Sequence, residues 1–264
     1  MMIRIVQLSD LHLSSRPLYG EIDTLAAFDR ALYRLSSVAP PDLLLITGDL
    51  VSSGTDEEYQ LLRSRLTALP FPYALLPGNH DDRPALRAAF PEQAWCEGPL
   101  CCQRIDVGEG TLLLLDTIVP GEEWGEVGSE QLAWLEHACP DARPVLLAQH
   151  QPPFLVGISG MDVIRCRGGE VLTGWLARHE TVAALLCGHV HRFVSTSFAG
   201  RPAMTAPSPA HQIALQDGPL AYTLEPGGYL VHDWWPGERL LTDYVPTAVA
   251  PIRVFADFYR THRE

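Results

Sequence analysis

Residues 43–49 read Leu43-Leu44-Leu45-Ile46-Thr47-Gly48-Asp49, a short apolar run that ends in a glycine and a carboxylate. Four other apolar runs end in polar side chains in a similar manner. They are Ile5-Val6-Gln7-Leu8-Ser9-Asp10-Leu11-His12, Ala74-Leu75-Leu76-Pro77-Gly78-Asn79-His80-Asp81, Val145-Leu146-Leu147-Ala148-Gln149-His150, and Ala183-Ala184-Leu185-Leu186-Cys187-Gly188-His189-Val190-His191. Because Val, Ile and Leu favour buried strands, these runs predict five strands with polar carboxyl ends.

Segments with a helical pattern separate these runs. Residues 21–38 carry apolar side chains at mostly helical spacing, which is typical of a helix that covers a sheet. We predict strands at 2–8, 43–47, 73–76, 112–116, 145–149 and 183–187, and helices at 21–38, 55–68, 83–90, 129–138 with Ser129 as N-cap, and 169–179. This alternation predicts an α/β fold whose strands are covered on both faces.

The pattern changes after about residue 190. Short strands are predicted at 193–198, 202–206, 220–225, 228–235 and 239–244, separated by glycine and proline turns. We interpret them as an antiparallel meander. We therefore divide the chain into a core over 1–200 and a β-rich segment over 201–264 that completes a second sheet, caps the site or takes part in dimerisation. Within that segment, residues 246–264 are expected to dock on a partner subunit.

Composition and charge limit the class of protein. With 47% hydrophobic and 19% charged residues in 264, the chain is expected to form one soluble core without membrane spans. The start has too short an apolar run for a signal peptide, so a cytoplasmic location is expected. A formal charge of −13 repels nucleic acid, and the six cysteines contain no Cys-x-x-Cys pair. Nucleic-acid binding, a zinc ribbon and a disulfide framework are thereby disfavoured.

The polar strand ends are expected to converge on one metal site, because ligands of open α/β sheets bind beyond the carboxyl ends of strands. The candidate ligands are Asp10, His12, Asp49, Asn79, His150, His189 and His191. Residues two apart at a strand end point the same way, so Asp-x-His and His-x-His each present two ligands. Imidazole and carboxylate without thiolate suit catalytic zinc, manganese, iron or cobalt.

Seven ligands are too many for one ion, so two divalent transition-metal ions are predicted, with Asp49 as the bridge at a separation of about 3.5 to 4 Å. Glycines 48, 78 and 188 directly precede ligand candidates, where the backbone must approach closely. Two aspartates, a bridging hydroxide and two divalent ions together leave a net charge of about +1. Such a centre attracts a phosphodiester monoanion in spite of the acidic surface.

At these residues the chain resembles the calcineurin-like metallophosphoesterase family. The family pattern D-x-H, G-D, G-N-H-D, a lone H and G-H-x-H spans residues 10–191 in this order. The segments Gln149-His150-Gln151-Pro152-Pro153 and Pro209-Ala210-His211-Gln212 are similar to those of class III cyclic nucleotide phosphodiesterases and bacterial glycerophosphodiesterases. The resemblance implies a four-layer α/β/β/α sandwich.

The resemblance also implies roles for the matched residues. One metal would be bound by Asp10, His12, Asp49 and His191, and the other by Asp49, Asn79, His150 and His189. Asn79 and His80 would meet the phosphate, where His80 would stabilise transition-state charge or protonate the leaving alkoxide. A metal-bound hydroxide would attack phosphorus in line with the leaving oxygen, without a covalent intermediate.

Several of these residues have a structural alternative. Asp10 alone would more often be a cap, a lone His150 would more often be structural, and Gly78 to Asp81 alone could be a tight turn. Asp81 is expected to be either a support for the ligands or a helix cap. His211, and Met161 in the loop 157–162, are candidates for substrate contact or for packing, whereas His232 is predicted to be structural.

The main hypothesis is a binuclear metal-dependent phosphodiesterase that hydrolyses 3′,5′-cyclic nucleotides, and glycerophosphodiesters are the alternative substrates. A non-catalytic scaffold of the same fold would be expected to have lost ligands, which are intact here. A phosphoserine or phosphothreonine phosphatase is disfavoured because Arg83 is the only arginine near the Asn-His motif. A homodimer or higher homo-oligomer is predicted.

Overall fold

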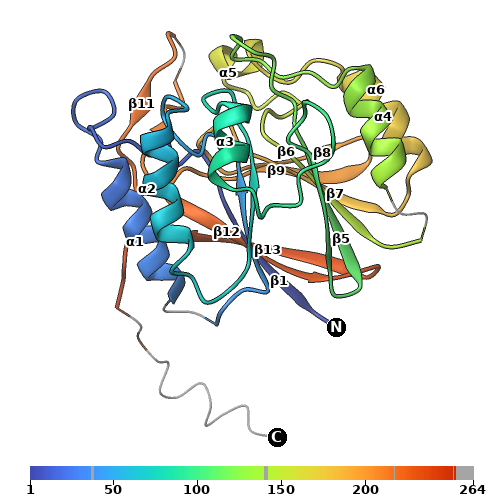
Figure 1. Ribbon diagram of the computed structural model, residues 1–264, viewed down its shortest axis with the longest axis horizontal. Coiled ribbons are helices and arrows are strands. Elements are labelled where there is room, and N and C mark those ends of the chain that lie inside the picture. The colour runs from blue at the N-terminus through green and yellow to red at the C-terminus, as the bar shows by residue number, and fades with distance from the viewer. Residues whose placement is uncertain (37–38, 140–141, 217, 252, 254–264) are drawn as a thin grey trace, which may run out of the picture.

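The computed structural model describes residues 1–36, 39–139, 142–216, 218–251 and 253. Two β-sheets pack face to face between layers of helices (Figure 1). The first sheet has the strand order β13 (Arg239–Pro246), β12 (Gly228–Trp235), β1 (Ile3–Leu8), β2 (Leu43–Thr47) and β3 (Tyr73–Leu76). The second has the order β4 (Gln103–Val107), β5 (Gly110–Leu115), β6 (Val145–Gln149), β7 (Val182–Cys187), β9 (Arg201–Thr205) and β8 (Val194–Phe198).

Helices α1 (Thr24–Ser36), α2 (Asp56–Leu66) and α3 (Arg83–Ala89) cover the first sheet, and α4 (Ser129–Ala138) and α6 (Gly169–Arg178) cover the second (Figure 1). Alternate residues of each strand face opposite layers. Ile5 of β1 packs in the core between the sheets, whereas its neighbour Val6 packs against the helices. The predicted four-layer α/β/β/α sandwich is confirmed. No described helix has the length and apolarity that a membrane crossing requires.

The carboxyl ends of the parallel strands of both sheets carry the predicted ligands. Strands β1, β2 and β3 are parallel to one another, and so are β5, β6 and β7. Below these ends, the buried Gln7 side-chain amide donates to Thr47 Oγ1 and to the Cys187 carbonyl, both at 2.9 Å, and so joins the two sheets. His232 Nε2 lies 3.0 Å from Gln7 Oε1, in agreement with its predicted structural role.

Most predicted strands and helices occur within a few residues of the predicted ends. The helix predicted at 21–38 is α1, whose residues 37 and 38 lie outside the described residues. Ser129 was expected as an N-cap but is the first residue of α4, and Gly128 is the N-cap. The strand predicted at 220–225 is only β11 (Tyr222–Thr223), which pairs with the unpredicted β10 (Gln212–Ile213). Strand β4 and the short helix α5 (Ser159–Val163) were not predicted either.

The predicted C-terminal meander is wrong, because its strands divide between the two sheets. The β8–β9 hairpin joins the second sheet, where β9 is parallel to β7. The β12–β13 hairpin joins the first sheet, where β12 is antiparallel to β1. The division at residue 200 stays a prediction, and the predicted docking of 246–264 falls largely on residues outside those described.

Candidate metal centre

The predicted ligands meet at the carboxyl ends of five strands. Asp10 and His12 follow β1, Asp49 follows β2, Asn79 follows β3, His150 follows β6, and His189 and His191 follow β7. Among the described residues, two buried groups have all their ligand atoms within 4.8 Å of one another. One group is Asp10, His12, Asp49 and His191, and the other is Asp49, His150 and His189.

Asp49 belongs to both groups, and its two carboxylate oxygens face different partners. Oδ2 lies 3.4 Å from His12 Nε2, and Oδ1 lies 3.4 Å from His150 Nε2. Oδ1 also accepts a hydrogen bond from the backbone N–H of His80 at 3.0 Å. This is the arrangement that a carboxylate shared by two cations needs.

His150 is oriented by a backbone carbonyl. Its Nδ1 lies 2.7 Å from the Thr47 carbonyl oxygen, which can only accept, so Nδ1 carries the hydrogen. In the neutral imidazole, which is the form that binds a metal, Nε2 is then the nitrogen with a lone pair, and it is buried without a hydrogen-bond partner. A histidine whose other nitrogen donates to a carbonyl is the usual arrangement of a metal-bound imidazole.

The electrostatics of the cluster fit divalent cations. Burial lowers the pKa of His12 and of His189 to about 3, so both imidazoles are neutral and able to bind a metal. Burial by itself would raise the pKa of Asp49, but the adjacent His150, whose own pKa is raised to about 9 by the nearby carboxylates in spite of its burial, holds it well below its usual range. Asp10 Oδ2 and His189 Nε2 are also buried without hydrogen-bond partners. Cations would satisfy these atoms, whose isolation is otherwise costly.

Five of the seven candidate ligands have left-handed backbone conformations. Their φ angles are 55° at Asp10, 45° at His12, 48° at Asp49, 69° at His189 and 55° at His191. Residues other than glycine adopt this region at a cost on the order of 1–3 kcal/mol, and such strain concentrates at functional sites. Backbone hydrogen bonds hold the turns in place, for example from Asp10 N to Gly48 O at 3.0 Å and from His12 N to Asp49 O at 2.9 Å.

Three glycines leave the space that the cluster occupies. A Cβ atom would lie 2.2 Å from His150 Nδ1 at Gly48, 2.3 Å from Asp49 N at Gly78, and 2.0 Å from Ser9 Oγ at Gly188. None of these distances is compatible with a side chain. The close approach that was predicted for these glycines is therefore a contact with the ligands themselves or with the residues next to them.

A Gly78→Ala variant is expected to lose about 1–3 kcal/mol of stability through overpacking and to bind metal more weakly, since its Cβ displaces Asp49 and His150. The matched control is Gly174→Ala in helix α6, where no atom beyond the adjacent residues and the helix's own backbone lies within 4 Å of the new Cβ. It should gain about 0.5–1 kcal/mol from helix propensity. Thermal unfolding measures the stability of the two variants, and manganese titration measures their metal affinity. Equal stability and equal affinity in the two variants would contradict the expectation.

Asn79 and His80 lie at the exposed side of the cluster. Asn79 is half-buried and His80 is exposed. His80 Nδ1 lies 2.9 Å from the Ser52 carbonyl, and the ring meets that of His12 edge to face at 4.6 Å between centroids. Donation from Nδ1 to the carbonyl leaves His80 Nε2 for a substrate atom.

The two other predicted substrate contacts occupy different surroundings. The ring of His211 is buried with its centroid 4.4 Å from that of His191, and it is 5.8 Å from each of the rings of Tyr19 and Tyr222. Met161 is buried in a small apolar cluster with Ile158 and Val190. Substrate contact by His211 and by Met161 stays a prediction.

Asp81 supports the ligand loops and is not a helix cap. Its Oδ2 accepts from Leu50 N at 3.0 Å and from Gly78 N at 2.8 Å, and its Oδ1 accepts from the Tyr59 hydroxyl at 3.0 Å. The cap of α3 is Asp82, which accepts from Ala85 N at 2.9 Å. Of the two alternatives for Asp81, the support of the metal ligands is the one that these contacts favour.

Sequence reasoning missed Ser208 as a part of the site. Its buried hydroxyl donates to the Asp10 carbonyl at 2.8 Å and so fixes the loop after β9 to the turn that carries the first ligand. The Pro207-Ser208-Pro209 segment was interpreted as a turn signal, and nothing in a local pattern indicates which carbonyl a serine will reach.

Comparisons with known proteins agree with this geometry. The family model described as Calcineurin-like phosphoesterase matches residues 3–193. A probable glycerophosphodiester phosphodiesterase, GpdQ, of Arcobacter nitrofigilis is 34% identical over 90% of this chain and 91% of its own length. The 3′,5′-cyclic adenosine monophosphate phosphodiesterase CpdA of Escherichia coli is 33% identical over 78% of this chain and 76% of its own. A dimetal phosphatase from Danio rerio has the same fold, with a TM-score of 0.70 at 12% identity over 93% and 96% of the two chains.

The chain belongs to the calcineurin-like phosphoesterase family. Membership confirms the resemblance that was deduced from the motifs, and with it the prediction of a metal-dependent hydrolase of phosphoesters.

Proposed function

We propose that this chain is a binuclear metal-dependent phosphodiesterase whose substrates are small phosphodiesters, with 3′,5′-cyclic nucleotides as the preferred class. The observation that carries the proposal is the position of Asp49, whose two oxygens face two different groups of imidazoles. One cation would be held by Asp10, His12, Asp49 and His191, and the other by Asp49, Asn79, His150 and His189. Divalent ions at such a centre activate water and polarise the phosphoryl oxygens.

The residues at the exposed side of the centre have the chemistry to handle the phosphate. The Asn79 amide can donate to a phosphoryl oxygen, and His80 Nε2 can hold or deliver a proton at the leaving oxygen. His80 is fixed by Ser52 and exposed, so it can meet a substrate without rearrangement. The presence of these residues argues against the alternative of a non-catalytic scaffold.

The contacts of Arg83 favour a phosphodiester over a phosphomonoester as the substrate. Its guanidinium is paired with the buried Asp116 carboxylate at 2.6 and 2.7 Å and donates to the Ile118 carbonyl at 2.7 Å. It is therefore occupied within the fold and is not placed to grip a phosphate dianion. A diester monoanion requires less positive charge, which two divalent ions supply.

An aromatic cluster beside the centre favours a substrate with a nucleobase. Tyr19 and Tyr222 stack at 4.8 Å between centroids with 23° between their planes. They are 62% and 36% exposed, and both meet His211 edge to face. Exposed aromatic faces near a phosphate site suit base stacking. Glycerophosphodiesters are the second candidate, favoured by the 34% identity with a relative named for that activity.

Turnover of cyclic AMP and of glycerophosphoethanolamine tests the proposal. Metal-stripped protein is assayed with each substrate before and after the addition of manganese. A manganese-dependent rate that is higher with cyclic AMP is the expected result, and a preference for glycerophosphoethanolamine would select the second candidate. If protein with two bound ions turns over neither substrate, the assignment of small phosphodiesters as the substrate class is overturned.

Tyr222→Leu should raise KM for cyclic AMP by about tenfold, because stacking on an aromatic ring contributes roughly 1–3 kcal/mol per base. KM for glycerophosphoethanolamine should change little, since that molecule has no ring to stack. Tyr33→Leu, an exposed tyrosine of helix α1, is the matched control. Equal effects on both substrates would argue against the stacking of a base on Tyr222.

Cytoplasmic location and homodimer formation stay predictions.

A further inference from the structure

Gln151 is a buried amide that follows the predicted ligand His150. Its side chain is fully shielded from solvent at the end of strand β6. The Gln151 Nε2 atom lies 3.4 Å from Asn79 Oδ1 and 3.3 Å from the Glu123 carbonyl oxygen. Both of these atoms accept, so the amide nitrogen of Gln151 is the donor in each contact.

Two neighbours determine which way this amide points. The Thr117 hydroxyl donates to Gln151 Oε1 at 2.8 Å, which places the oxygen on the Thr117 side and the nitrogen toward Asn79. A Cβ atom at Gly125 would lie 2.5 Å from Gln151 Oε1, so a glycine leaves the space that the amide fills. The Gln149 side chain donates to the Gln151 backbone carbonyl at 2.6 Å and holds the segment from below.

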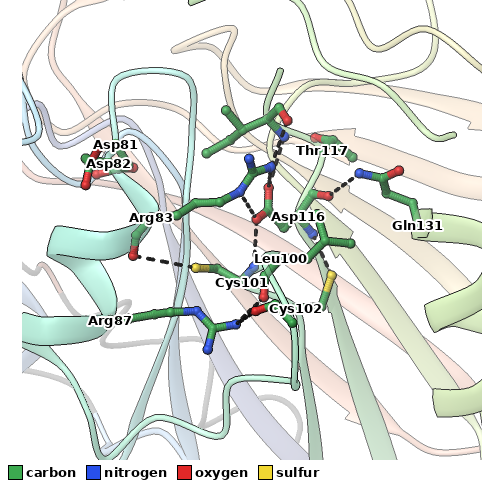
Figure 2. A network of polar contacts seen from close by, with 12 residues as sticks. Asp81, Asp82, Arg83, Arg87, Leu100, Cys101, Cys102, Asp116, Thr117 and Gln131 are labelled. Atoms are coloured by element: carbon green, nitrogen blue, oxygen red, sulfur yellow. Dashed lines mark hydrogen bonds and ion pairs between the residues drawn. The ribbon is translucent and has the colours of Figure 1, made fainter. Parts of the chain in front are cut away.

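A buried ion pair joins the loops that carry Asn79 and Thr117. Figure 2 shows Arg83, at the start of α3, reaching Asp116 at the end of β5. Asp116 also accepts from the backbone N–H groups of Cys101 at 2.7 Å and of Ile118 at 3.0 Å, so its carboxylate is fully engaged. A closed ring of contacts therefore runs from Asn79 along the chain to Arg83, across to Asp116 and Thr117, and back through Gln151.

We propose that Gln151 is a positioning residue that holds the Asn79 oxygen in place as a metal ligand. The inference rests on the proposed function, in which Asn79 shares the second cation with Asp49, His150 and His189. A donor at Oδ1 prevents the half-buried amide from exchanging its oxygen for its nitrogen, because two N–H groups would then face each other. The other lone pair of Oδ1 stays free for a cation. Partners of this kind orient ligands and affect metal affinity.

Stepwise calorimetric titration of metal-stripped protein with manganese tests the inference. Gln151→Met keeps the volume of the side chain and removes the donor. It should weaken one of the two equivalents by roughly 10- to 100-fold and leave the other unchanged. The matched control is Gln103→Met, a buried glutamine of strand β4 whose amide donates to the Leu75 carbonyl and that makes no contact with Asn79 or Gln151, and both equivalents should bind to it as in the parent.

A second variant tests the same ring if Gln151→Met does not fold, as judged from thermal unfolding. Thr117→Val removes the hydroxyl that orients the Gln151 amide, and it should weaken the same single equivalent to a smaller degree. Unchanged affinities, or equal weakening of both equivalents, would overturn the role of Gln151. Parent protein that binds fewer than two ions would instead refute the binuclear function, so the two failures are distinguishable.

Discussion

Asp49→Asn should remove both metal ions together. The substitution replaces one of the two carboxylate oxygens that face His12 and His150 by an amide NH2, which cannot bind a cation. The negative charge of the predicted ligand set is also halved, since Asp10 and Asp49 are its two carboxylates. Loss of an outer partner costs about 10- to 100-fold in metal affinity or activity, and a shared ligand should cost more than that.

Metal content by elemental analysis and turnover of a phosphodiester measure this effect. Asp29→Asn, at an exposed position of helix α1, is the matched control and should retain two ions and the parental rate. Two ions per chain with a normal rate in Asp49→Asn would show that the carboxylate is not shared between two metals.

His80→Ala should keep both metal ions and lose turnover. The His80 ring contacts Ser52 and His12 but belongs to neither group of ligand atoms. A positioned side chain that transfers a proton contributes roughly 10²–10⁴-fold to a rate, so we expect a loss of that size. The loss should be largest with a poor leaving group, because an alkoxide needs protonation more than a nitrophenolate does.

Comparison of two diesters with different leaving groups separates this role from metal binding. His137→Ala, at an exposed position of helix α4, serves as the control. An unchanged rate on the diester with the poor leaving group would refute the proton-transfer role, and a fall in metal content would assign His80 to the metal site instead.

The elements that sequence reasoning found are those with strong local signals. Strand β2 and strand β6 are continuous apolar runs and occur at the predicted residues. Strand β4 has exposed Arg104 and Asp106 on an edge of the sheet, and β10 has two residues, so neither produces a clear pattern. The predicted meander failed for another reason, because strand spacing does not indicate which sheet a hairpin joins.

The site shows the same limit. The candidate ligands could be selected from the sequence because carboxylate, amide and imidazole side chains follow apolar runs within a few residues. The contacts that orient them could not, since Ser208 reaches Asp10 over 198 residues and Gln151 reaches Asn79 over 72. Hydrogen bonds between such distant segments have no signature in a local window.

By itself, the sequence predicted an α/β fold and the set of candidate metal ligands, because apolar periodicity and ligand chemistry are properties of short segments. The resemblance of the motifs to the calcineurin-like family implied the four-layer sandwich and the division of the ligands into two groups. Tertiary structure decided which oxygen of Asp49 faces which group of imidazoles and which nitrogen of His150 is available. It also decided that ligands such as Asp10 and Asp49 have a left-handed backbone. These features depend on contacts such as that of His12 with His191, which are 179 residues apart and meet only when the two sheets pack.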